Sequence, residues 1–227
     1  MPTKKPVQRL SDAVKEAVEG LGYIEIPLEM GLINHSALAR KIKPALEKKL
    51  QHPLAVEAIT MAIHRHVRPK PRQPTGQLYD VIKNSKVELE PNAALLHFSF
   101  KMGLEERLNQ AKANIVFEGG KARIIDRTNE ITVVTQMRFV NDVIKAAQQK
   151  PLVVQERLSL VTVDYGAKGS HTPAVLSHFT NILGQAGMNI WVVITSYSKT
   201  SFLINESDAL QAYDRFMRAI SAANEYG

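Results

Sequence analysis

The sequence contains no cysteine and only one tryptophan in 227 residues. Without cysteine the chain forms no disulfide, offers no thiolate to a metal or an iron–sulfur cluster, and has no cysteine nucleophile. No apolar run approaches the roughly 18 residues that a membrane span needs, and the N-terminus lacks the apolar core of an export signal. We therefore expect a cytoplasmic protein with no membrane partner. A hydrophobic content of 44% also excludes a disordered chain.

Acidic residues are outnumbered mainly in the first third of the chain. Residues 1–74 contain 13 Lys and Arg against 7 Asp and Glu, whereas residues 75–227 contain 16 against 15. This asymmetry indicates a module that faces a polyanion, joined to an electrically balanced one. A basic tail and a solvated lysine-rich helix with no partner are the alternative.

A proline-rich segment, Arg68–Gly76, separates the two parts and predicts an extended linker. Before it, apolar residues recur at helical spacing in three segments. The first follows Ser11, which we expect to be its N-cap. The second begins at Asn34 or Ser36, and the third runs from about Leu54 to Val67.

Three helices with a short break at His52-Pro53 match a helix-turn-helix, in which the third helix would face DNA. The first residues of that helix are poor readers of base edges, so the cations suit phosphate contacts better than sequence reading. Some of them also complement a helix dipole without any partner. DNA binding therefore stands beside a helical packing or oligomerisation module. The expected nucleic-acid contacts are Arg40, Lys41, Lys43, Lys48, Lys49, His64, Arg65, Arg68 and Lys70.

After the linker, short strands alternate with helices. The order from Leu158 is strand, helix, strand, strand, helix, and residues 92–155 give a comparable alternation. This order predicts two α+β sandwiches, each with a small sheet and helices on one face. The expected strands are Ala93–Phe100, Ile115–Phe117, Ala122–Ile125, Ile131–Thr135, Leu158–Val163, Ile190–Thr195 and Thr200–Asn205, with a hairpin turn at Gly119-Gly120. The expected helices are Leu104–Ala113, Phe139–Ala147, a segment from Pro173 to about Gly184, and Asp208–Ala222.

Several motifs follow one another in the last part of the chain. They are a Pro-x-Val-Leu helix start at Pro173, a Gly-x-Asn-Ile turn at Gly187–Ile190, a serine-rich strand end at Ser196–Ser198 and the pair Asp208-Ala209 on the last helix. Together they resemble an ACT domain, most closely the ACT modules of aspartokinases. The resemblance covers roughly residues 158–222.

The rest of the chain adds weaker similarities. Residues 92–155 resemble a degenerate ACT module. The motif Ile-Asn-x-Ser-Ala-Leu-Ala-Arg, here at Ile33–Arg40, is similar to one found in prokaryotic ACT-containing proteins. The expected fold is therefore α+β: a helical, helix-turn-helix-like head (1–74), a degenerate ACT-like module (75–155) and an ACT module (156–227), the modules being βαββαβ ferredoxin-like sandwiches.

The resemblance implies that the modules bind a small ligand, usually an amino acid, often where two ACT modules meet. Glycines in the loop after Leu158–Val163 let backbone amides approach a ligand, and a helix beginning at Thr172-Pro173 favours a carboxylate. Turn and cap roles alone, or sheets that only join subunits, are the alternatives. The expected ligand-binding residues are Asp164, Gly166, Gly169, Thr172, Pro173, Asn189, Ile190, Ser196 and Ser198.

The sequence departs from the aspartokinase pattern at three positions. Lys168 and His171 enlarge the first loop, and Tyr197 is bulky between the two serines, so the identity of the ligand stays open. No kinase domain precedes the modules, and aspartokinase activity is not carried over.

No catalytic arrangement is visible in the sequence. His64 and His66 point to different helix faces, and neither a Gly-x-Ser-x-Gly elbow nor a phosphate-cradling loop is present. We expect no enzyme, no cofactor and no metal. Two functions remain: a regulator that senses a small effector, an amino acid above all, and acts on a head that contacts DNA, or a homo-oligomeric scaffold that binds neither.

Overall fold

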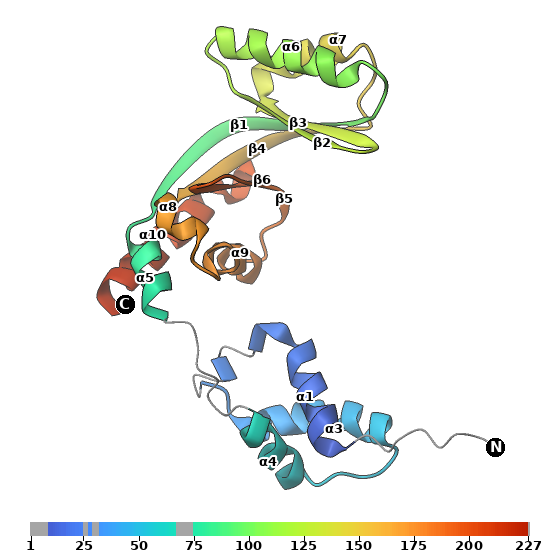
Figure 1. The fold of residues 1–227 in the computed structure, drawn as a ribbon, viewed down its shortest axis with the longest axis vertical. Coiled ribbons are helices and arrows are strands. Elements are labelled where there is room, and N and C mark those ends of the chain that lie inside the picture. Colours follow the sequence, from blue (N-terminus) through green and yellow to red (C-terminus); the bar gives the residue numbers. More distant parts are fainter. Residues whose placement is uncertain (1–8, 25–26, 29–31, 67–74, 227) are drawn as a thin grey trace, which may run out of the picture. The chain divides into compact units, whose positions relative to one another are not determined.

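The computed structural model describes residues 9–24, 27–28, 32–66 and 75–226. The chain divides into two compact units, Met1–Gln73, here named the head, and Pro74–Gly227, here named the sheet unit (Figure 1). No helix of the described residues is long and apolar enough to cross a membrane. Most of the expected linker lies outside the described residues, and its last two residues, Thr75 and Gly76, begin a helix instead.

Helices pack around a single apolar core in the described part of the head. Val14, Ile59 and Ile63 have no exposed surface and come from two of these helices. The second and third helices lie where their apolar spacing predicts them. The helices are α1 (Leu10–Gly20), α3 (His35–Leu50) and α4 (Val56–His66), with a 3₁₀ turn at Gly22–Ile24.

Of the N-caps predicted for the head helices, one is confirmed and one is wrong. Asn34 caps α3, because its Oδ1 accepts hydrogen bonds from Ser36 N and Ala37 N at 3.0 and 3.1 Å. The expected cap at Ser11 is wrong. Helix α1 already begins at Leu10, which packs against the core, so Ser11 lies inside the first turn.

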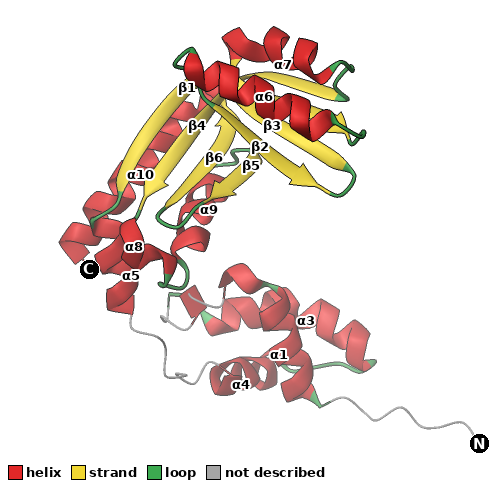
Figure 2. Ribbon diagram, turned by 45° about the horizontal axis from the view of Figure 1, so that its top comes forward, coloured by secondary structure: helices red, strands yellow, loops and turns green. Residues whose placement is uncertain are grey.

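The sheet unit is built on one antiparallel sheet with the strand order β2-β3-β1-β4-β6-β5 (Figure 2). The 14-residue β1 and the 12-residue β4 lie at its centre. The strands are β1 (Lys86–Ser99), β2 (Ala122–Arg127), β3 (Glu130–Gln136), β4 (Val153–Asp164), β5 (Ile190–Thr195) and β6 (Lys199–Asn205); the helices are α5 (Thr75–Lys83), α6 (Leu104–Phe117), α7 (Val140–Ala147), α8 (Gly166–Ser170), α9 (Val175–Gln185) and α10 (Ala209–Tyr226), with 3₁₀ turns η2 (Met137–Phe139) and η3 (Glu206–Asp208).

The sheet unit contains an internal repeat. The order strand, helix, strand, strand, 3₁₀ turn, helix runs once from β1 to α7, the first repeat, and again from β4 to α10, the second repeat, which adds α8 before its first helix. Ala93 of β1 pairs with Leu158 of β4, and each follows a residue with positive φ, Asn92 (57°) and Arg157 (56°). The two central strands therefore bend at equivalent points.

Both repeats place their helices on the same face of the sheet. Leu96 packs under α6 and α7, whereas its neighbour Leu95 faces the other side. In β4, Val161 packs under α9 and α10, whereas Leu160 faces the side of Leu95. The sheet curls, so that α6 and α7 lie on one outer side and α9 on another, and a small apolar core with Leu203 fills the inner face (Figure 1).

The prediction of two separate small sheets is wrong, because all six strands join one sheet. The physical reason is the length of the central strands: β1 pairs with β4 through residues 86–90 and with both β3 and β4 beyond the bend. Residues 86–90 were not predicted as strand, because their alternating charges left no apolar run. The expected strand at Ile115–Phe117 is wrong, because these residues are the last turn of α6. The expected strands from residue 122 onward are confirmed, but β4 begins at Val153, five residues before its predicted start.

Candidate ligand-binding site

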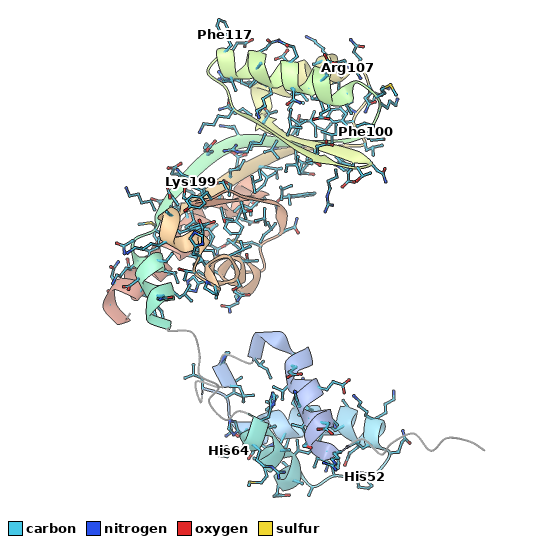
Figure 3. The ribbon with its side chains drawn as sticks, viewed as in Figure 1. His52, His64, Phe100, Arg107, Phe117 and Lys199 are labelled. Carbon is cyan, nitrogen blue, oxygen red and sulfur yellow. The ribbon has the colours of Figure 1, made fainter. Side chains whose placement is uncertain are left out.

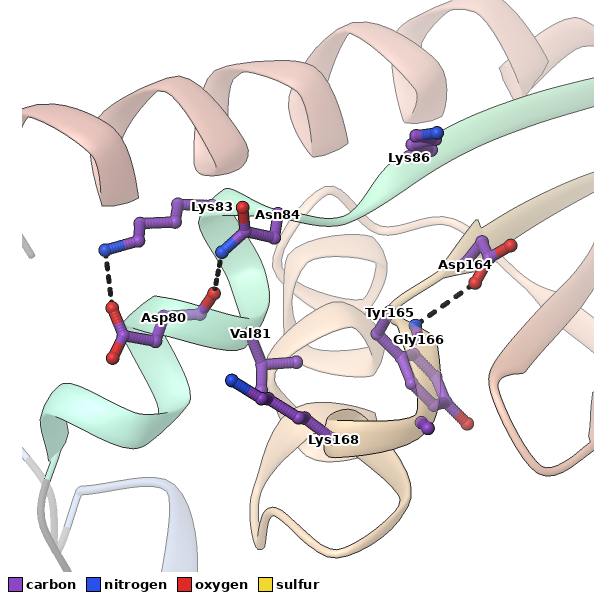
Figure 4. Close-up of a pocket in the computed structure, with 10 residues that line it drawn as sticks. Asp80, Val81, Lys83, Asn84, Lys86, Asp164, Tyr165, Gly166 and Lys168 are labelled. Atoms are coloured by element: carbon purple, nitrogen blue, oxygen red, sulfur yellow. Dashed lines mark hydrogen bonds and ion pairs between the residues drawn. The ribbon is translucent and has the colours of Figure 1, made fainter.

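A pocket of about 700 Å³ opens beside the start of β1 and the end of β4. Helix α5 supplies one wall, and the loop that leads from β4 into α8 supplies the other (Figure 4). All of it belongs to the sheet unit. The pocket is lined by Asp80, Val81, Lys83, Asn84, Lys86, Asp164, Tyr165, Gly166, Ala167 and Lys168.

Three lysines line this pocket, and they differ in their pairing. Lys83 Nζ lies 2.5 Å from Asp80 Oδ1, one helical turn away. Lys86 and Lys168 are exposed and have no ion-pair partner among the described residues. The hydrogen bond and charge of Lys83, and more weakly the charge of Lys168, lower the pKa of Asp80. The pocket thus offers two unpaired ammonium groups beside the ionised carboxylate of Asp80.

Asp164 anchors the loop on the β4 side. Its Oδ1 accepts a hydrogen bond from Gly166 N at 3.1 Å, and its Oδ2 lies 3.0 Å from Lys199 Nζ. Burial opposes its charged form, but the bonds from Lys199 and Gly166 and the charges of Lys199 and Lys86 outweigh it and lower the pKa of Asp164. The carboxylate is therefore ionised and engaged in holding the loop.

Tyr165 fixes the path of the chain after Asp164. Its backbone N–H donates to Ser198 O at 2.9 Å, and its hydroxyl lies 3.2 Å from Thr200 Oγ1. The ring covers Gly169, where a Cβ would approach it to 2.2 Å. The absence of a side chain at Gly169 therefore leaves room for the Tyr165 ring.

The predicted ligand residues fall into separate places. Asp164 and Gly166 line the pocket. The expectation that a helix begins at Thr172-Pro173 is wrong, because α9 begins at Val175 and α8 intervenes. Thr172 Oγ1 instead donates to Lys168 O at 2.9 Å, so it closes the turn after α8.

The remaining predicted ligand residues lie at the two opposite ends of β5. Ser196 and Ser198 lie at the end of the sheet that carries Tyr165, since Tyr165 contacts both of their carbonyls. Asn189 and Ile190 lie at the opposite end of β5, which at ~3.3 Å per residue is about 20 Å away. Within this chain, therefore, the nine predicted residues do not form one site.

The α5 side of the pocket was not predicted from the sequence. Asp80 and Asn84 belong to a helix that the linker prediction displaced, and Lys86 begins the unpredicted part of β1. Their approach to Asp164 depends on the pairing of Lys86 with Asp164 across 78 positions of sequence. The helical spacing of Leu78, Val81 and Ile82 was the signal available for α5.

The cations predicted to contact nucleic acid are only partly free. Lys43 Nζ lies 3.6 Å from Glu47 and Lys49 Nζ lies 2.6 Å from Glu16, so both are ion-paired. Arg40, Lys41 and Lys48 are exposed on α3 and have no ion-pair partner among the described residues.

Two of the predicted cations at the end of α4, His64 and Arg65, form hydrogen bonds within the head. His64 Nδ1 lies 3.1 Å from His35 Nδ1 (His64 is labelled in Figure 3), and Arg65 Nε donates to Met61 O at 3.3 Å. Arg68 and Lys70 lie outside the described residues. Among the residues that the structure describes, no group of three or more His, Asp or Glu could hold a metal ion.

Comparison with known proteins gives a likeness of fold. Neither protein-family models nor curated proteins give a match. Among solved structures, aspartate kinase of Clostridium acetobutylicum is 12% identical with a TM-score of 0.50, over 59% of this chain and 34% of that chain. The chain therefore spans about a third of that enzyme. This likeness supports the ACT-like α+β architecture expected from the sequence.

Two further structures give lower scores. The regulatory subunit of aspartate kinase from Thermus thermophilus is 18% identical with a TM-score of 0.48, over 59% of this chain and 95% of that chain. Aspartokinase III of E. coli, in complex with aspartate and ADP, is 17% identical with a TM-score of 0.47, over 59% of this chain and 32% of that chain.

Proposed function

We propose that the chain is a non-enzymatic regulatory protein whose sheet unit binds a small amino acid in the pocket between α5 and the β4–α8 loop. The observation that carries this proposal is the pair of unpaired ammonium groups, Lys86 and Lys168, beside a cavity of about 700 Å³. A carboxylate bonds well to such cations. Asp80, held ionised by Lys83, accepts hydrogen bonds from the ammonium group of the same ligand.

The proposal includes the division of the sheet unit into two ACT-like modules. Residues 75–155 and 156–227 give the proposed limits, with the central strands crossing between them. The internal repeat of elements supports this division. A ligand acts as a regulator only where it binds two arrangements of the protein with different affinity, and the pocket lies where the shared strands begin and end.

Isothermal titration of the full chain with each common amino acid tests the ligand site. We expect one class of amino acid to bind and Lys168→Gln to weaken it at least tenfold, since a hydrogen bond to a charged group contributes about 1.5–3 kcal/mol. Lys112→Gln, an exposed lysine on α6, is the matched control and leaves the affinity unchanged. Absence of heat and of any thermal shift with every amino acid refutes the site.

The head is proposed to contact DNA phosphates through the exposed face of α3. The support is the exposed set Arg40, Lys41 and Lys48, which are unpaired among the described residues. We expect duplex binding by the full chain that weakens with salt, and a salt slope reduced by about 1 for each lysine replaced by glutamine. Lys15→Gln, which removes a lysine paired with Glu19, is the control. No binding at low salt overturns this part.

The scaffold function makes the opposite prediction for assembly. Light scattering of the full chain with and without the amino acids separates the two. An oligomer that forms in their absence, together with no ligand binding, supports the scaffold. An assembly or unfolding temperature that changes with one amino acid supports the regulator.

A further inference from the structure

The sheet has an open strand edge next to the helices of the first repeat. The N-terminal residues of β4, Val153–Gln155, pair with β1 on one side only, since pairing with β6 begins at Leu158. The equivalent open edge next to the helices of the second repeat is Lys86–Glu90 of β1, because pairing with β3 begins at Ala93. An open edge presents unpaired backbone groups on which another strand can add.

The two open edges differ in their side chains. On β1, Glu88 lies 3.6 Å from Lys199 and Glu90 lies 3.0 Å from Lys121, and Pro91 follows. Charged residues and proline are the usual protection of an edge strand. This edge is therefore closed to pairing although its backbone is open.

The β4 edge carries apolar side chains instead. Leu152, Val153 and Val154 are 64%, 44% and 40% exposed. Lys150 and Glu156, which flank them, are exposed and have no ion-pair partner among the described residues. Surface of this kind on an open edge is a template for pairing with a further strand.

We infer that two copies of this chain pair antiparallel through Lys150–Glu156, with a two-fold axis at Val153. In this register Leu152 lies opposite Val154 of the second copy, and Lys150 lies opposite Glu156. The two-fold axis produces each of these pairs twice. The segment thus complements itself in both apolar surface and charge, which selects a second copy over an unrelated partner.

The backbone supports the same register. Phe100 N donates to Asn129 O at 2.9 Å, which directs the N–H and C=O groups of the even-numbered residues of β1 toward β3 and those of Leu95 and His97 toward β4. Val153 and Gln155 are the partners of His97 and Leu95, so they turn these groups to β1, and Val154 between them turns its own to the open edge. In the proposed register Val154 N–H donates to Leu152 C=O of the second copy, and the two-fold axis repeats this bond. The two Val153 residues then form a non-hydrogen-bonded pair at the axis, in which the side chains lie close together.

Light scattering of the full chain across a concentration series tests the surface. We expect a dimer, which Val153→Lys dissociates, because a lysine on each copy then meets its own image at the axis. Val193→Lys, at an exposed valine on the other edge strand β5, is the matched control and leaves the dimer intact. Circular dichroism checks that both variants fold.

A charge exchange tests the register. Lys150→Glu places two carboxylates opposite each other twice per dimer, and Glu156→Lys does the same with two ammonium groups. Each cross-strand charge pair contributes up to about 1 kcal/mol, so we expect each single variant to raise the dissociation constant by about tenfold. The double variant restores the opposite charges, and we expect its dissociation constant to return to within about threefold of the original.

Two outcomes overturn the inference. One is a chain that stays monomeric at every concentration. The other is a dimer that resists Val153→Lys or that Val193→Lys dissociates, which places the interface elsewhere. The inference does not rest on the proposed amino-acid site, since none of Lys150–Glu156 lines the pocket. Loss of dimerisation with retained ligand binding, or the reverse, separates the two.

Discussion

The two repeats of the sheet unit share backbone devices that their sequences do not share. The helix after the first strand follows a left-handed residue in both, Gly103 (φ 76°) and Ala174 (φ 70°). That helix ends in both with a hydrogen bond from residue i+5 back to residue i, Gly120 N to Ile115 O and Met188 N to Leu183 O. The two repeats therefore share their backbone path, although different side chains occupy the equivalent positions.

The side chains differ where they fill the space at the end of that helix. In the first repeat Phe139 occupies it, and a Cβ at Gly120 would lie 2.2 Å from its ring. In the second repeat Met188, at the position of Gly120, is itself buried, and Asp208 takes the position of Phe139. The large side chain that fills this space therefore comes from the 3₁₀ turn in the first repeat and from the end of the helix in the second.

The largest effect expected from this difference is at Gly120. We expect Gly120→Ala to lower the free energy of unfolding by about 2–3 kcal/mol, because overpacking a core that holds both Phe139 and Ile115 forces them to shift. Gly184→Ala, in α9 with open space around it, is the control and raises stability by up to about 1 kcal/mol. Urea unfolding followed by Trp191 fluorescence measures both, since this single tryptophan lies on β5. Equal effects of the two changes contradict the packing difference.

The second effect concerns the fourth residue of each helix after its left-handed cap. Arg107 (labelled in Figure 3) donates from Nη2 to Ala147 O at 3.2 Å, where the short α7 ends. The equivalent His178 has a buried Nε2 without a hydrogen-bond partner among the described residues, and α10 continues past the corresponding point. We expect Arg107→Met to lower the unfolding free energy by about 1–2 kcal/mol, since a helix-end carbonyl loses its donor.

His178 supplies the matched comparison. Burial lowers its pKa, so the native state resists protonation that the unfolded chain accepts. Stability from the neutral ring is present above its ordinary pKa of about 6.5 and is lost as the pH falls below it. We expect His178→Leu to raise the unfolding midpoint in urea, and more at pH 5 than at pH 8. A pH-independent difference contradicts this assignment.

The third effect is a pair of opposite sign at the left-handed caps. Gly103→Ala adds a Cβ to a residue with φ 76°, whereas Ala174→Gly removes the Cβ from a residue with φ 70°. The left-handed region costs a residue with a Cβ roughly 1–2 kcal/mol, so we expect a loss of about 1 kcal/mol in the first repeat and a smaller gain in the second. Thermal unfolding of both variants measures this. Two changes of the same sign show that the positions are not equivalent.

Local pattern predicted most of the elements, because each depends on neighbours within one turn or one hairpin. Asn34 and the α9 turn at Gly187 are of this kind. The shared sheet was not predictable, since nothing local in the alternating charges of residues 86–90 reports that β4 pairs with them. The pocket was not predicted for the same reason, because Asp80 and Lys168 come to line one cavity only when β1 pairs with β4. The prediction that Asn189 and Ser196 share one site was wrong, because an extended strand, β5, lies between them and holds them at opposite ends.

The smallest effect is expected at the end of the central strands, where the repeats differ in charge. Asp164 pairs with Lys199 in the second repeat, whereas the equivalent Ser99 lies opposite Glu130 in the first. The hydrogen bond and charge of Asp164, with the charge of Glu88, raise the pKa of Lys199, and the pKa of Asp164 lies below its usual 3.8. The ion pair is partly exposed to solvent, so its contribution is small.

The sign of the pH dependence follows from the two shifts. A lowered carboxyl pKa stabilises the native state above about pH 4, and the stabilisation disappears as the pH falls through the native value. A raised lysine pKa stabilises it below about pH 10.5, and this is lost as the pH rises further. We therefore expect Asp164→Asn to lower the unfolding temperature slightly at pH 7, and we expect this deficit to shrink as the pH falls below about 3.8. Glu118→Gln, which removes an exposed carboxylate with no ion-pair partner among the described residues, is the control. A deficit that does not shrink as the pH falls contradicts a contribution from the ionised carboxylate, and the second repeat then differs from the first in its loop alone.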